Sequence, residues 1–290
     1  MEYDGEDEML KRVITGAIFI ACILPVLIFS HTWAFPIAIA TISVICLFEM
    51  IRCMGMHKHI AMTAPLYIFA VAFPILQRVF IGSDKFYIVG GIALISVVAY
   101  VAYLFAWVIF SRGKIAYPDV CTLFLTAIYL LFSMNMVLYI RDYKDGQYIY
   151  VLILIGSCVT DIFAYFVGRL FGKHKLAPDV SPKKTIEGSI GGIIFCTIGF
   201  VVTGLIVGAI DPETSPNYLY LAISGVIISV ISQSGDLIMS VIKRHYKIKD
   251  FGKILPGHGG MLDRMDSLLA AAPGVELLII FSFLTGISLF

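Results

Sequence analysis

Charged residues are scarce in this chain of 290 residues: they make up 14% of it, against roughly 25% in soluble proteins. Hydrophobic residues reach 59% and the mean hydropathy is +0.93. So little charge excludes an ordinary soluble domain. Apolar stretches long enough to cross a bilayer recur along the whole chain instead, which predicts an all-α, polytopic helical membrane protein.

Cysteine is sparse and unpatterned. None of the 6 cysteines stands in a C-x-x-C pair, and no second His or Cys stands at ligand spacing from His258. No disulfide framework or zinc site is therefore predicted, and the cysteines are expected to act as small apolar side chains.

The N-terminal segment lacks the features of a signal peptide. It starts with the acidic run M-E-Y-D-G-E-D-E before Lys11 and Arg12, and the apolar run that follows has no convincing cleavage site. We therefore expect the first apolar run to stay as a membrane anchor. Internal repeats, low-complexity tracts and a soluble linker domain are also absent from the sequence.

The apolar runs predict about nine transmembrane helices, at about 13–30, 33–51, 61–81, 86–110, 119–140, 147–168, 189–210, 217–242 and 267–289. If the N-terminus is cytoplasmic, only four of the 21 Lys and Arg residues fall outside: Arg78, Lys85, Arg141 and Lys144. Because basic residues concentrate on the cytoplasmic side, this distribution predicts a cytoplasmic N-terminus.

Polarity divides the chain in two. Residues 1–145 read as a transmembrane scaffold, in which Glu49 is the only acid well inside an apolar run. Residues 146–290 carry further membrane acids and two basic cytoplasmic loops, at about 169–188 and 243–266, so the chemistry is expected there. For Glu49 and Glu276 we expect helix-end or packing roles.

Asp236 lies near the predicted cytoplasmic end of its span. An ionised carboxylate inside a membrane helix costs roughly 2.5–3.5 kcal/mol, so it usually faces a partner or an aqueous cavity. Asp236, Ser240 and Lys243 share one helical face, which aims a carboxylate, a hydroxyl and an ammonium at one place. The alternative is a salt bridge between Asp236 and a neighbouring lysine.

Asp263 and Asp266 follow the turn L-P-G-H-G-G. Glycines at 257, 259 and 260 allow a positive φ, close approach to a phosphate and free amide groups, and His258 is a candidate phosphate donor. A loop that folds back could bring Asp236 and Asp263 together, and such carboxylates among basic residues fit Mg²⁺ with substrate phosphates. Favourable interaction with the helix dipole is a sufficient alternative for either acid alone, and His258 could be an ordinary loop histidine.

The other basic loop follows Asp161, which lies inside a span with Tyr165, Gly168 and Arg169 close to its face. The segment S-P-K-K-T-I-E-G then presents Ser181, Lys183, Lys184 and Thr185. The lysines suit a triphosphate or an anionic lipid headgroup. An ordinary positive-inside loop remains the alternative.

Two segments carry a family resemblance. Residues 240–266 read S-V-I-K-R-H-Y-K-I-K-D-F-G-K-I-L-P-G-H-G-G-M-L-D-R-M-D. This run resembles the signature of the phosphatidate cytidylyltransferases, also called CDP-diacylglycerol synthases, and matches it at every specified position. The block D-I-F-A-Y-F-V-G-R-L-F-G-K-H-K-L with S-P-K-K-T-I-E-G is similar to a second block of that family.

The resemblance implies an enzyme that condenses CTP with phosphatidate to CDP-diacylglycerol and pyrophosphate. It implies a Mg²⁺-dependent reaction, with room for a second cation, at the cytoplasmic face of a bacterial membrane, and a homodimer. The metal ligands would be Asp236, Asp263 and Asp266, and no nucleic acid partner is expected. The catalytic set would also include Lys243 and Arg264, and the substrate would contact Ser240, Arg244, His258, Gly259, Gly260, Ser181, Lys183, Lys184, Thr185, Asp161 and Arg169.

Other functions compete with this interpretation. A transporter or channel also carries membrane acids, but it predicts inverted repeats or paired broken helices, and its polar residues should gather near the midplane. A CTP-using enzyme that acts on an isoprenoid-ether lipid shares most of the features above. A CDP-alcohol phosphotransferase would need a D-G-x-x-A-R motif, which the sequence lacks.

Overall fold

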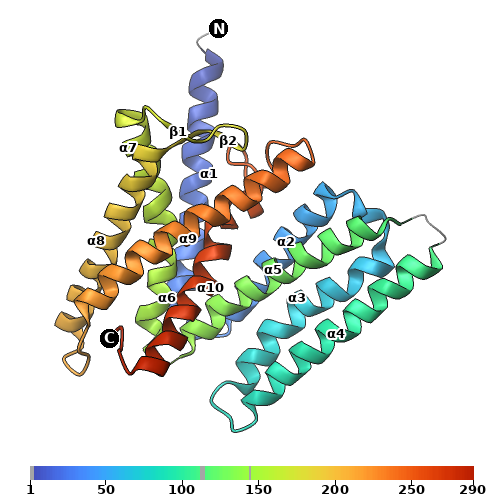
Figure 1. The fold of residues 1–290 in the computed structure, drawn as a ribbon, viewed down its shortest axis with the longest axis horizontal. Helices are drawn as coiled ribbons and strands as arrows, with labels where there is room; N and C mark the ends of the chain where they lie inside the picture. The colour runs from blue at the N-terminus through green and yellow to red at the C-terminus, as the bar shows by residue number, and fades with distance from the viewer. Residues whose placement is uncertain (1–2, 112–114, 144) are drawn as a thin grey trace. The chain divides into compact units, whose positions relative to one another are not determined.

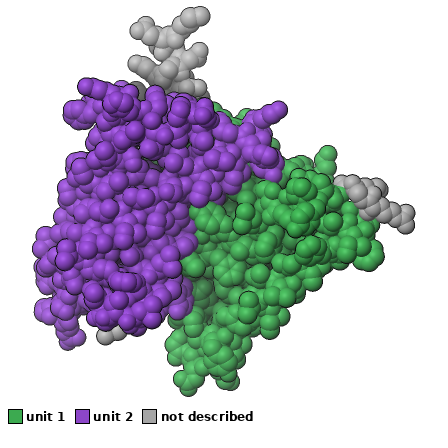
Figure 2. All heavy atoms as spheres, viewed as in Figure 1, with its two compact units in different colours: residues 1–138, 248–264 green, residues 139–247, 265–290 purple. Residues whose placement is uncertain are grey.

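The computed structural model describes residues 3–111, 115–143 and 145–290 (Figure 1). It forms two compact units (Figure 2), which we call unit 1, residues 1–138 with 248–264, and unit 2, residues 139–247 with 265–290. The segment 248–264 belongs to the same unit as the N-terminal helices, although in sequence it lies within the predicted catalytic region.

The regular secondary structure of the described residues is helical apart from two short strands. The helical elements are α1 Tyr3–Ile28, α2 Ala34–Cys53, η1 Met56–Lys58, α3 Ile60–Phe80, α4 Phe86–Phe110, α5 Tyr117–Arg141, α6 Gly146–Leu154, η2 Ile155–Val159, α7 Thr160–Phe171, α8 Ile186–Ile210, α9 Tyr218–His245 and α10 Leu262–Thr285. The prediction of an all-α protein is confirmed.

Within the described residues, 8 helical segments are long and apolar enough to cross a membrane, and they match eight of the predicted spans. The first predicted span, at about 13–30, corresponds to α1, whose apolar part Ile14–Ile28 is shorter than the others. The chain is thus a multi-pass membrane protein. The orientation of its termini stays a prediction.

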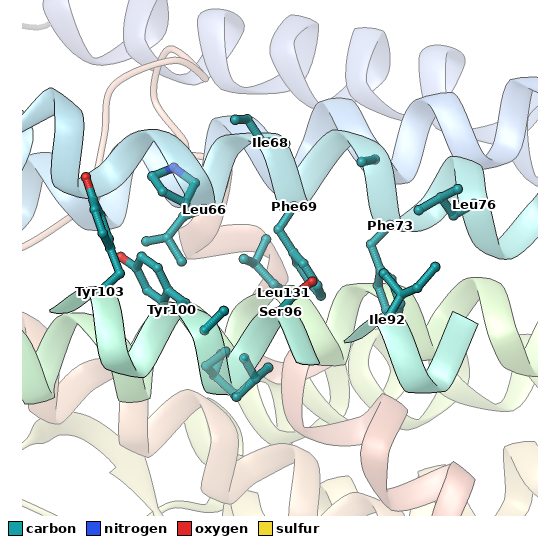
Figure 3. Close-up of a pocket in the computed structure, with 15 residues that line it drawn as sticks. Leu66, Ile68, Phe69, Phe73, Leu76, Ile92, Ser96, Tyr100, Tyr103 and Leu131 are labelled. Atoms are coloured by element: carbon teal, nitrogen blue, oxygen red, sulfur yellow. The ribbon is translucent and has the colours of Figure 1, made fainter. Parts of the chain in front are cut away.

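Unit 1 packs α3 and α4 around an apolar cavity of about 400 Å³ (Figure 3). Phe69 and Phe73 of α3 and Ile92 of α4 line it, and α5 adds Leu131. The hydroxyl of Tyr100 donates to the Met62 carbonyl at 3.1 Å, so this polar atom at the cavity wall is satisfied. The cavity offers hydrocarbon surface and little hydrogen-bonding capacity.

Unit 2 is built on a close contact between α7 and α8. A methyl group added at Gly188 would lie 2.5 Å from the Ala164 carbonyl oxygen and 3.0 Å from the Gly168 Cα. Only glycine lets the two backbones approach this far, as in other membrane helix pairs with small residues at the interface. The contact fixes α7, which carries Asp161, against α8.

The basic loop at 169–188 is not irregular throughout. It contains an antiparallel hairpin of β1, Lys175–Ala177, and β2, Ser181–Thr185, with Lys175 opposite Thr185 and Ala177 opposite Ser181. Thr185 then caps α8, its hydroxyl accepting from the Gly188 N–H at 3.1 Å. The hairpin holds β2 at the start of α8.

Replacing Gly188 by alanine should destabilise the protein, because the new methyl group overlaps α7. We expect a loss of about 1–3 kcal/mol, seen as a lower thermal unfolding temperature in detergent. Gly91→Ala is the matched control, since nothing lies within 4 Å of a methyl group at that helical glycine. Equal unfolding temperatures for the two variants would contradict the close α7–α8 packing.

Candidate functional site

A polar pocket of about 300 Å³ lies within unit 2 and gathers most residues predicted from the basic loop at 169–188. Its walls come from α7, the hairpin, α8 and α9. The lining includes Asp161, Ala164, Tyr165, Gly168, Arg169, Leu176, Lys183, Lys184, Thr185, Ser189, Gln233 and Asp236. The predicted grouping of Asp161 with Tyr165, Gly168 and Arg169 is therefore confirmed.

Asp161 follows η2, a π-helical turn that interrupts the span between α6 and α7. Such turns change the direction of side chains within a helix and are frequent at functional sites. One and two helical turns further on, Tyr165 and Arg169 face the same pocket, and the Arg169 Nη1 donates to the Tyr165 hydroxyl at 3.2 Å. The helix thus contributes both an acid and a guanidinium to the lining of one pocket.

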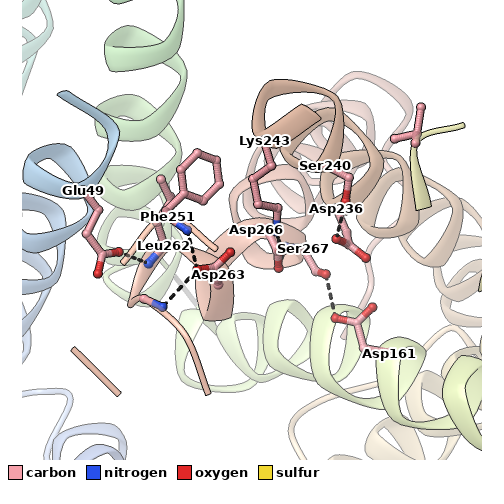
Figure 4. Close-up of polar contacts among 12 residues, drawn as sticks. Glu49, Asp161, Asp236, Ser240, Lys243, Phe251, Leu262, Asp263, Asp266 and Ser267 are labelled. Carbon is pink, nitrogen blue, oxygen red and sulfur yellow. Dashed lines mark hydrogen bonds and ion pairs between the residues drawn. The ribbon is translucent and has the colours of Figure 1, made fainter. Parts of the chain in front are cut away.

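Asp236 enters the pocket from α9. Its carboxylate forms an ion pair with the Lys184 ammonium of β2, and the Ser240 hydroxyl donates to its Oδ1 at 3.5 Å (Figure 4). The predicted common face of Asp236 and Ser240 is confirmed. The salt bridge that the sequence left open as an alternative also exists, with a lysine from the other basic loop.

Asp266 and Lys243 form a second pair in unit 2. The Lys243 Nζ lies 3.9 Å from the Asp266 Oδ2, and their exposed fractions are 9% and 8%. Gly235 packs directly on α10 here, since a methyl group at that position would lie 3.1 Å from the Asp266 carbonyl oxygen. This packing brings Asp266 beside the helix that carries Asp236.

Ser267 links two of the acids. Its hydroxyl donates to the Asp161 Oδ2 at 2.6 Å, and its backbone N–H donates to the Asp266 Oδ1 at 2.9 Å (Figure 4). Sequence reasoning missed this residue, because a serine beside an acid in an apolar helix gives no distinctive pattern.

The charges of this cluster, Asp161, Asp236 and Asp266 with Lys184 and Lys243, fit a hard cation. Three carboxylates face two ammonium groups, and oxygen is the ligand that Mg²⁺ prefers. Among the described residues no group of three or more His, Cys, Asp or Glu is arranged as a ready-made metal site. A Mg²⁺ ion needs only one or two protein carboxylates when substrate phosphates and water complete its shell, so the donor set fits.

Asp263 lies in unit 1, at the start of α10. Its Oδ2 accepts from the Phe251 N–H at 2.8 Å and from the Gly260 N–H at 2.9 Å (Figure 4). It therefore ties together the two ends of residues 251–260, which we call the glycine-rich loop. The expectation of a free amide at Gly260 is wrong, because Asp263 occupies it. The predicted convergence of Asp263 with Asp236 and its role as a metal ligand stay predictions.

Glu49 of α2 holds the same loop from the other side. Its carboxylate, 2% exposed, accepts from the Met261 N–H at 3.1 Å and from the Leu262 N–H at 2.8 Å. It thereby satisfies amides at the N-terminus of α10, a position that favours negative charge. A helix-end or packing role was expected, and the structure instead shows a carboxylate that caps another helix. Sequence reasoning missed these partners, because they are backbone amides far away in the sequence.

Two glycines of the loop make room for Glu49. A methyl group at Gly260 would lie 2.5 Å from both of its carboxylate oxygens, and one at Gly252 would overlap the carboxylate. The predicted positive φ occurs at Gly257 (75°) and Gly259 (89°), and the same prediction for Gly260 is wrong. The glycines of this motif therefore allow a turn of the backbone and leave space for a carboxylate.

The remaining predicted residues lie at the edges. The Arg244 Nε donates to the Val180 carbonyl at 3.1 Å and so supports the hairpin, while Ser181 is part of β2. Arg264 is exposed. His258 packs near Gly16 of α1, 3.8 Å from where a side chain would start, and its buried Nδ1 has no hydrogen-bond partner in the described chain.

Comparison with known proteins agrees with this chemistry. A model of the cytidylyltransferase family matches residues 10–282. The chain belongs to the cytidylyltransferase family. It is therefore a nucleotidyltransferase that uses CTP, and the transporter interpretation is discarded.

Relatives from three bacteria align along nearly the whole chain. A protein of Bacillus subtilis (strain 168) named phosphatidate cytidylyltransferase is 32% identical over 270 residues, covering 92% of this chain and 96% of that protein. Proteins of the same name from Staphylococcus haemolyticus (strain JCSC1435) and Staphylococcus saprophyticus (strain ATCC 15305) are each 33% identical, covering 94% of this chain and 99% of theirs. The cytidylyltransferase family thus accounts for both units.

Replacing Glu49 by glutamine should loosen the start of α10. The amide group keeps the shape of the carboxylate but loses its charge, so the Met261 and Leu262 N–H groups are less well satisfied. We expect a destabilisation of about 1–3 kcal/mol and faster hydrogen exchange at these two amides. Glu213→Gln, at an exposed loop acid, is the control. Unchanged exchange at both amides in Glu49→Gln would contradict the capping role.

Proposed function

We propose that this enzyme is a phosphatidate cytidylyltransferase, which condenses CTP with phosphatidate to give CDP-diacylglycerol and pyrophosphate. The observation that carries the proposal is the unit 2 pocket, where carboxylates of membrane helices meet basic side chains from α7 and the hairpin. Full-length relatives named for this activity support the choice of lipid substrate.

The reaction needs little acid–base chemistry. An oxygen of the lipid phosphate attacks the α-phosphorus of CTP in line, the bond to the β-phosphate breaks, and pyrophosphate leaves. A phosphate monoester has a second pKa of about 6, so it is mostly dianionic near neutral pH and nucleophilic without a general base. The protein must instead bring two polyanions together and neutralise their charge.

The basic residues of the pocket would do this. Lys183, Lys184 and Arg169 line it, and guanidinium and ammonium groups bind phosphate oxygens through charge-assisted hydrogen bonds. Lys184, which is paired with Asp236, would exchange that carboxylate for a substrate phosphate. Asp236 is then left facing the incoming phosphates with its negative charge uncompensated.

Asp236 and Asp266 would hold Mg²⁺ once Lys184 has moved to a substrate phosphate, and the proposal includes a second cation. A bound Mg²⁺ ion would neutralise phosphate charge and polarise the reacting phosphoryl group. Lys243 forms an ion pair with Asp266, and Asp266 also accepts a hydrogen bond from the Ser267 N–H. We further propose that the enzyme works as a homodimer in a bacterial cytoplasmic membrane, with the pocket on the cytoplasmic side.

Purified protein with Mg²⁺, labelled CTP and phosphatidate should release pyrophosphate and form a nucleotide lipid that extracts into chloroform. An isoprenoid-ether phosphate lipid, offered in parallel, tests the nearest alternative substrate. Labelled product from the ether lipid alone would overturn the assignment of phosphatidate.

Asp236→Asn should lower turnover about 10²-fold or more, because it removes a charge that the reaction needs while keeping the side-chain shape. Asp84→Asn, at an exposed loop acid, should keep full activity. Both variants are compared for membrane insertion and thermal unfolding. Full turnover in a folded Asp236→Asn protein would remove Asp236 from the mechanism.

A further inference from the structure

A second concave site lies entirely within unit 1. It has a volume of about 460 Å³ and is lined by Arg52 and Cys53, at the end of α2, and by residues 248–253. This volume falls in the range of roughly 300–1,000 Å³ that is typical of ligand sites. It shares no lining residue with the pocket of unit 2.

Positive charge dominates its lining. Arg52, Lys249 and Lys253 are exposed, and Asp250 is the only acid among the lining residues. In the part of the chain that the structure describes, none of these three cations has a side-chain hydrogen bond or ion pair. The Asp250 carboxylate lies by the Gly259 turn, its Oδ1 3.4 Å from where a Gly259 side chain would start. A hollow lined by three cations and one acid favours an anion inside it.

The pocket wall is fixed from within. The backbone N–H of Phe251 donates to Asp263, and the ring of Phe251 is buried. Next to it, Gly252 has no room for a side chain because the Glu49 carboxylate lies behind it. The loop therefore cannot collapse toward the protein, and the backbone on either side of Phe251 and Gly252 is held in place. Such preorganisation lowers the entropic cost of binding a ligand.

Basic residues are generally enriched beside a membrane surface, which would explain why these residues are positively charged. It would not explain why three of them line one pocket. The Lys58 side chain in η1 of the same unit provides the comparison, since it is exposed and does not line the pocket. If surface charge were the whole explanation, Lys58 and Lys253 would respond to anions alike.

We propose that this pocket, formed by Arg52, Lys249 and Lys253, is a phosphate-binding site. The planar guanidinium of Arg52 matches two phosphate oxygens, and the lysines add mobile point charges. The ligand is a phosphate group, which can belong to a soluble polyphosphate such as CTP or pyrophosphate, or to an anionic lipid headgroup. The proposal does not depend on the catalytic role of the unit 2 pocket, because binding is measured without turnover.

The test is lysine footprinting of the full-length protein. A water-soluble acylating reagent modifies exposed lysines, and mass spectrometry reports the rate at each position. In detergent, saturating pyrophosphate or CTP should slow acylation of Lys253 several-fold and leave Lys58 unchanged. Arg52→Ala should raise the ligand concentration that gives half-maximal protection by about tenfold or more, as expected for a lost charge-assisted contact.

A second arm separates the two sources of phosphate. The protein is placed in vesicles of phosphatidylcholine, with or without an added anionic phospholipid, and no soluble phosphate is present. Protection of Lys253 but not Lys58, only in the anionic vesicles, would assign the site to a lipid headgroup. Equal protection of both lysines, or none of Lys253 in either arm, would overturn the proposal. Since Arg52 is exposed, its truncation should not impair folding.

Discussion

A carboxylate placed among apolar helices needs a partner, and this requirement shapes much of the structure. Removing such a charge from water is costly unless hydrogen bonds or an opposite charge compensate it. Glu49 accepts hydrogen bonds from two backbone amides, and Asp161 accepts one from the Ser267 hydroxyl. Asp236 forms an ion pair with Lys184. Each of these contacts joins segments far apart in the sequence, so the same interactions that satisfy the acids also position the loops around the sites.

The glycine-rich loop illustrates how these needs combine. Asp263 and Glu49 occupy its amides, and Gly252 and Gly260 leave space for the Glu49 carboxylate. A loop held in this way is a rigid support for the side chains it presents. In unit 2 the hairpin plays the corresponding part, because it carries Lys184 to Asp236 and is itself tied to α9 by Arg244.

Much of the fold could be predicted from hydropathy, because a bilayer-spanning helix must be long and apolar whatever surrounds it. Eight spans were found this way, and the common face of Asp236 and Ser240 follows from helical periodicity alone. The hairpin was not predicted, since S-P-K-K-T reads as an ordinary basic loop. The role of Glu49 was out of reach for a similar reason: its partners are backbone atoms some two hundred residues away in sequence.

The sequence by itself determined the membrane class, the helical spans and the chemistry of the two basic loops, because composition and local spacing set these properties. It also carried the motif that places the chain among the cytidylyltransferases. Only the tertiary structure decided which lysine meets Asp236, which amides Asp263 and Glu49 bind, and why Gly260 must lack a side chain. These pairings depend on how helices and loops pack in three dimensions, which local periodicity does not determine.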